Sequence, residues 1–85
     1  MHHETTLHGI RFRGVWVNNT CHWYCDDLVM DPFRVDDRTP LSLRSFRAGI
    51  LAGRLIQIKG FEFLDAEETA NEIFAALRLY ESLLS

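Results

Sequence analysis

The sequence lacks the long apolar runs that mark membrane-spanning helices and the apolar leader that marks secretion. No stretch approaches the roughly 20 apolar residues that a membrane span requires. The first ten residues, MHHETTLHGI, contain no hydrophobic region of a signal peptide. Only two cysteines are present, too few for a disulfide framework. These absences predict a cytoplasmic protein that does not interact with a membrane.

Motifs of metal binding and catalysis are also missing. The histidines and cysteines show none of the C-x2-C, H-x3-H or H-E-x-x-H spacings that are typical of zinc sites. The chain has neither a nucleophile elbow nor a glycine-rich phosphate loop. We therefore predict that the protein is not an enzyme and uses no cofactor. A metal or small-molecule site near His22 is the alternative that these residue types leave open.

The composition is that of one small domain with more apolar residues than it can easily bury. The chain has 85 residues, of which 47% are hydrophobic and 12% aromatic, and its formal net charge is -3. A chain of this length buries only about 60% of its unfolded surface. We predict a single domain spanning residues 1–85, with a flexible N-terminus over residues 1–8 and an apolar surface that a partner chain covers.

Residues 11–26 predict a β-hairpin. Asn18 and Asn19 form a two-residue turn, because asparagine tolerates positive φ, and this turn places Gly14 opposite Trp23. Glycine at that position leaves room for the indole. Alternation along both strands puts one apolar set on a single face: Phe12, Gly14, Trp16, Cys21, Trp23 and Cys25.

The cysteines of this hairpin are predicted to be core residues. Cys21 and Cys25 lie four positions apart, or about 13 Å along a strand, whereas a disulfide needs Cα atoms within about 7 Å. His22 points to the opposite face from both. The pattern therefore favours buried thiols over a disulfide, a shared metal ion or a catalytic Cys–His pair.

The rest of the chain predicts a further edge strand, two helices and a strand between them. Residues 28–30 are consistent with a short third strand, which Pro32 would confine to a sheet edge. A helix is capped by Thr39, with Pro40 in its first turn, or alternatively by Ser42, and it stops at Gly53. Its predicted buried stripe is Leu43, Phe46 and Ile50. Alternation predicts a strand over residues 55–63, and a capping pattern at Asp65 starts a last helix over residues 65–84.

This order, β-β-(β)-α-β-α, predicts an α+β fold. The hairpin leads a small antiparallel sheet, and both helices pack on the apolar face of that sheet.

The last helix carries more apolar surface than one sheet face can cover. Ile73, Leu77 and Tyr80 form a stripe that faces the sheet. A second set lies beside this stripe and remains for an interface: Phe74, Leu79 and Leu83. We predict a homodimer, or a complex with another protein, with these residues at the contact. The alternative is that residues 28–35 fold over the helix and cover the second set within one chain.

A second candidate surface is basic. Arg44, Arg47 and Arg54 share one helix face and form a patch for an anion or a charged partner. Together with Arg11, Arg13 and Tyr24 on the outer face of the hairpin, this patch is the basis of a nucleic-acid-binding alternative. The negative net charge disfavours that alternative. We predict a small non-enzymatic protein-binding or regulatory module, such as an inhibitor or adaptor.

Overall fold

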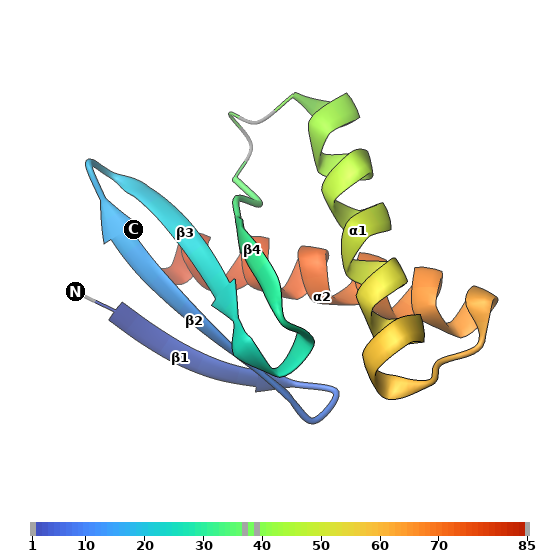
Figure 1. Ribbon diagram of the computed structural model, residues 1–85. Helices are drawn as coiled ribbons and strands as arrows, with labels where there is room; N and C mark the ends of the chain where they lie inside the picture. The colour runs from blue at the N-terminus through green and yellow to red at the C-terminus, as the bar shows by residue number, and fades with distance from the viewer. Residues whose placement is uncertain (1, 37, 39, 85) are drawn as a thin grey trace.

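The computed structural model describes residues 2–36, 38 and 40–84. Four strands form one antiparallel sheet in the order β1-β2-β3-β4, and two helices follow, which confirms the predicted α+β class (Figure 1). The strands are β1 (His2–Leu7), β2 (Ile10–Val17), β3 (Thr20–Cys25) and β4 (Met30–Phe33). A 3₁₀ turn over Asp26–Leu28 precedes β4, and the helices are α1 (Leu41–Lys59) and α2 (Phe63–Leu84).

The predicted hairpin is present in the predicted register. Val17 pairs with Thr20 and Gly14 pairs with Trp23, and both turn asparagines have positive φ. The apolar face is buried, with Trp23 at 0% exposure and Phe12 at 1%. A Cβ on Gly14 would lie 2.9 Å from the Cys21 Sγ and 3.0 Å from the Trp23 ring. The sheet therefore needs glycine at this position.

The N-terminal segment is a strand, whereas we predicted a flexible tail over residues 1–8. Strand β1 pairs with β2 along its whole length, from His2 opposite Val15 to Leu7 opposite Ile10. His8 and Gly9 form the connecting turn, both with positive φ. Apolar alternation gave no signal here because the strand has only one large aliphatic side chain, and the backbone ladder holds it in place.

The predicted third strand exists, but it lies slightly later in the chain than residues 28–30. Strand β4 begins at Met30 and contains Pro32 at the edge of the sheet, as proline requires. Leu28 belongs to the preceding 3₁₀ turn, where it is fully buried. The pairing of β4 with β3 is irregular between Trp23 and Cys25.

The predicted strand over residues 55–63 is wrong, because α1 continues through Gly53 to Lys59. The helix ends at Gly60, whose φ of 73° is left-handed and whose N–H donates to the Ile56 carbonyl. Alternating isoleucines suggested a strand, but Leu51 and Leu55 lie four residues apart and are both fully buried. Packing against α2 therefore overrides the weak β preference of this segment.

The helix also buries a different face from the predicted one. Leu43, Phe46 and Ile50 are 44%, 65% and 43% exposed, and the buried side chains of α1 are Leu51, Ala52 and Leu55. The predicted N-cap at Thr39 lies outside the described residues. Pro40 precedes the first turn and accepts hydrogen bonds from the backbone N–H groups of Leu43 and Arg44.

Helix α2 covers one face of the sheet, and α1 lies beside the edge strand β4 rather than on that face (Figure 1). The Trp23 and Tyr80 rings meet edge to face, and Phe33 stacks on Phe74 at 5.3 Å between centroids. The predicted stripe of α2 is buried at Ile73 and Leu77. Because α2 lies behind both the sheet and α1, it joins the buried side chains of the sheet and those of α1 into one core.

Candidate functional site

An open groove runs between β4 and α1, and we call it the α1–β4 groove. Its volume is about 340 Å³. Its apolar lining comes from both elements and from the residue before β4: Val29, Met30, Pro32, Phe33, Leu43, Phe46 and Ile50. The acidic residue of the lining is Asp31. Among the apolar side chains, Val29, Leu43, Phe46 and Ile50 are each at least 43% exposed. A groove with this lining can bind apolar side chains of another molecule.

Val29 has an unfavourable backbone conformation at the end of this groove. Its φ of 49° and ψ of 56° are left-handed, a region that β-branched residues rarely adopt. Its side chain is nevertheless 68% exposed, so burial does not compensate for the strain. Glycine or asparagine would suit this turn better for folding alone. Strained residues of this kind cluster at ligand-binding sites.

Two of the three predicted patch arginines line the same groove. Arg47 and Arg54 are half-buried, and Arg47 donates to the Arg34 carbonyl over 3.4 Å. Arg54 donates to the Gln57 side chain over 3.4 Å. Arg44 is half-buried on the same helix but is not part of the groove lining. The basic residues predicted from sequence therefore flank an apolar site that sequence reasoning missed.

The predicted interface residues of α2 do not stay together. Phe74 is only 6% exposed and is stacked on Phe33 in the core. Leu79 and Leu83 are 63% and 76% exposed on the outer face of the helix. The segment around β4 thus covers Phe74 but leaves both leucines uncovered.

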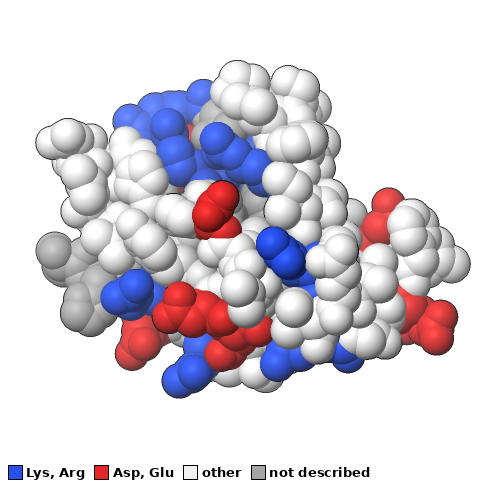
Figure 2. Space-filling model, in the orientation of Figure 1, with Lys and Arg blue, Asp and Glu red and all other residues white. Residues whose placement is uncertain are grey.

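The start of α2 forms a second exposed apolar surface, which we call the acidic α2 start. Phe63 and Leu64 are 64% and 74% exposed. Four exposed acidic residues surround them in the sequence: Glu62, Asp65, Glu67 and Glu68. In Figure 2, red atoms flank an uncoloured patch at the right-hand edge, where Figure 1 places the turn from α1 into α2.

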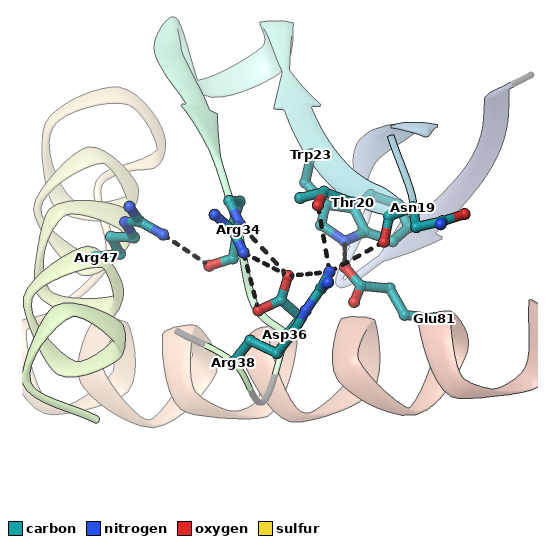
Figure 3. Close-up of polar contacts among 8 residues, drawn as sticks. All are labelled: Asn19, Thr20, Trp23, Arg34, Asp36, Arg38, Arg47 and Glu81. Atoms are coloured by element: carbon teal, nitrogen blue, oxygen red, sulfur yellow. Dashed lines mark hydrogen bonds and ion pairs between the residues drawn. The ribbon is translucent and has the colours of Figure 1, made fainter. Parts of the chain in front are cut away.

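A polar cluster joins the end of the sheet to the connection between β4 and α1 (Figure 3). Asp36 pairs with Arg34 at 3.0 Å and with Arg38 at 3.5 Å. Arg38 also donates to the Asn19 carbonyl at 3.0 Å and to the Thr20 hydroxyl at 3.2 Å. These contacts hold the connection against the hairpin turn, beside a pocket of about 240 Å³ that Trp16 and Glu81 also line.

Glu81 is the buried acid of this pocket. Its side chain accepts a hydrogen bond of 2.6 Å from the Trp23 indole N–H, and the residue is 7% exposed. Burial raises the pKa of the Glu81 carboxyl, and the charge of Asp36 adds to the effect. The hydrogen bonds from Trp23 and Cys21 and the charge of Arg34 oppose this rise in pKa. The contact spans 58 positions of sequence, so no local pattern could have revealed it.

We expect Glu81→Gln to make the protein more stable than the wild type at neutral pH. A carboxyl whose pKa rises on folding binds its proton more tightly in the folded state, so wild-type stability falls as pH rises through the folded-state pKa. Glutamine keeps an acceptor for Trp23 without the buried charge. Urea unfolding at several pH values should show the two proteins converging near pH 4.5, the ordinary value for this carboxyl. A difference independent of pH would contradict this account.

The cysteines lack the properties of catalytic nucleophiles. Cys21 and Cys25 are both free and 1% exposed. Burial raises the pKa of the Cys21 thiol to about 12, with the Glu81 charge adding to the shift, and burial also raises the pKa of Cys25. Both thiols are therefore protonated near neutral pH, and a thiol is a poor nucleophile.

Within the described part of the chain, no group of three or more His, Cys, Asp or Glu side chains is arranged to hold a metal ion. His22 is half-buried and pairs across the hairpin with Val15. As predicted, it lies on the other face of the hairpin from the cysteines. On that face the Arg13 guanidinium lies 5.0 Å from the centre of the Tyr24 ring. Arg11 pairs with Asp27 at 3.1 Å.

Comparisons with known proteins give no family for this chain. No protein-family model, curated protein or solved structure matches it. Among the residues that the structure describes, no helix has both the length and the apolar character needed to cross a membrane.

Proposed function

We propose that this protein is a non-enzymatic protein-binding module and that the α1–β4 groove is its binding surface. The observation that carries the proposal is Val29, which combines a strained backbone with a 68% exposed apolar side chain in the groove. Selection for folding alone disfavours both properties at one residue. Contact with a partner would bury this side chain and its neighbours Phe46 and Ile50.

The type of contact follows from the edge strand. Strand β4 contains Pro32, which has no N–H, and its pairing with β3 is irregular. Both features oppose addition of a further strand at this edge. The groove is therefore suited to a partner that inserts apolar side chains between β4 and α1, with Arg47 and Arg54 favouring acidic groups beside them.

The test compares substitutions of similarly exposed residues on one helix. Phe46→Asp places a charge in the groove, whereas Leu41→Asp places one outside it, at a residue that is 70% exposed. Tagged proteins are used to capture partners, a second copy of the chain included, and the recovered proteins are quantified. We expect Leu41→Asp to retain the wild-type partner and Phe46→Asp to lose it. Equal recovery with all three proteins would contradict the assignment of the groove.

Val29→Gly is the second variant of this test. Glycine relieves the left-handed strain, so thermal unfolding should show a protein at least as stable as the wild type. Loss of the isopropyl group should nevertheless weaken partner binding. This opposite movement of stability and binding separates a binding role for Val29 from a structural one, because a structural residue would lose stability on truncation.

Nucleic-acid binding is the alternative, and several of its arginines already have partners within the chain. Arg11 pairs with Asp27, Arg13 lies over the Tyr24 ring, Arg47 donates to the Arg34 carbonyl, and the net charge of the chain is -3. A gel-shift titration at low and physiological salt tests it. The alternative requires binding that weakens steeply as salt increases.

A further inference from the structure

We infer that the partner which fills the α1–β4 groove is a second copy of this chain, inserting its acidic α2 start. The inference rests on the proposed function of the groove and names the occupant. Its basis is that one chain displays both halves of a complementary contact. An apolar groove whose charged lining is two arginines and one aspartate, Asp31, lies between β4 and α1, and an exposed apolar pair among acids lies at the start of α2.

The net charges of the two surfaces are opposite, because the two groove arginines outnumber Asp31 whereas the α2 start carries only acids, and the surfaces are separated on the molecule. Arg47 and Arg54 line the groove, and blue atoms are visible in Figure 2 between the surfaces over β4 and α1. The acids of the α2 start lie at the edge of that view. A second copy can therefore place acids beside the arginines without bringing its own arginines there. Complementary potentials of this kind fix the orientation of an interface.

The apolar groups match as well as the charges. Phe63 and Leu64 project from the first turn of α2, and each is more than 60% exposed. Glu67 lies four residues after Phe63 and three after Leu64, so it shares their side of the helix. Inserting the apolar pair into the groove would bring Glu67 near the arginines. If two copies exchange this contact, both grooves are filled and the assembly closes as a dimer.

The outer face of α2 is the other candidate surface for a homodimer interface. Leu79 and Leu83 are exposed there, with Leu84 exposed at the helix end, but the other exposed residues beside them are Ala75, Arg78 and Ser82. A stable interface buries about 800 Å² on each partner, and three leucines supply a small part of that area. The groove and the α2 start together offer six large exposed apolar side chains: Val29, Leu43, Phe46, Ile50, Phe63 and Leu64.

A charge-reversal exchange tests the inference. The variants are Arg54→Glu, in the groove, and Glu67→Arg, at the α2 start. Each variant alone sets like charges against each other in both exchanged contacts, so we expect self-association to weaken by about tenfold or more. In an equimolar mixture of the two variants, one contact of the mixed dimer joins the two reversed charges, which attract each other. The other contact keeps the native pair, so the mixed dimer should recover. Sedimentation velocity over a concentration series measures the association.

The matched control is Leu79→Lys combined with Leu83→Lys, which should leave association unchanged. A mixture that associates no better than either charge variant, or loss of association in the control, would overturn the inference. A wild-type chain that stays monomeric at high concentration would overturn it too. In that last case, loss of a foreign partner by Phe46→Asp would still support the groove as a binding surface, so the two proposals fail separately.

Discussion

Replacing Trp23 by alanine should unfold a large part of the population. The indole is 0% exposed, contacts Tyr80 edge to face, and donates its N–H to Glu81. Truncating a buried aromatic costs about 3–5 kcal/mol. A small domain has a total stability near the lower end of about 5–15 kcal/mol, so the variant would keep little of it. Urea unfolding followed by far-ultraviolet circular dichroism measures the loss.

Two variants divide this effect into its causes. Trp23→Phe keeps an aromatic ring but removes the donor to Glu81, so it should lie between the wild type and Trp23→Ala. Trp16→Ala removes the other tryptophan of the same face, which is only half-buried, and should cost less than Trp23→Ala. Equal losses from Trp16→Ala and Trp23→Ala would show that Trp23 does not have the central place in the core that the structure gives it.

The second large effect is expected from a single methyl group at Gly14. Alanine at an ordinary strand position usually gains stability over glycine, because it restricts the unfolded chain. Here the new Cβ would lie 2.9 Å from the Cys21 Sγ and 3.0 Å from two carbons of the Trp23 ring. We expect Gly14→Ala to destabilise the protein by about 1–3 kcal/mol, the usual cost of overpacking. Chemical unfolding measures the sign and size of the change.

The control for Gly14→Ala is the same substitution on α1. Gly49 is exposed. Apart from its two chain neighbours and the backbone of its own helix, no described atom lies within 4 Å of a Cβ built there. Gly49→Ala should stabilise the helix by up to about 1 kcal/mol. In a Trp23→Phe background, where the distal indole carbons are absent, Gly14→Ala should cost less than in the wild type. Additive costs would mean that the clash with Trp23 is not the cause.

The hairpin could be predicted from sequence because its signals are local and agree with one another. The Asn18–Asn19 turn fixes the register, and the register puts the apolar residues on one face. Strand β1 lacked such signals, since its position depends on backbone pairing with β2. The sequence signal for β1 was Gly9, because glycine suits a turn with positive φ such as the His8–Gly9 turn.

The helices were harder to predict because tertiary contacts decide which face is buried. The spacing of Leu43, Phe46 and Ile50 is helical, but so is that of Leu51 and Leu55, and only the position of α2 decides between the two faces. The α1–β4 groove could therefore not be predicted from the sequence, although its arginines were identified as a candidate patch. The left-handed conformation of Val29 has no sequence signal either, because valine is a typical strand residue.

We propose that the α1–β4 groove and the acidic α2 start together form the contact surface of this protein. A dilution series monitored by amide chemical shifts tests it residue by residue. We predict concentration-dependent shifts in residues 29–33 and 43–54, which contain the groove lining, together with residues 62–68 at the start of α2. Shifts centred on Leu79 and Leu83, or no shifts up to millimolar concentration, would contradict the claim.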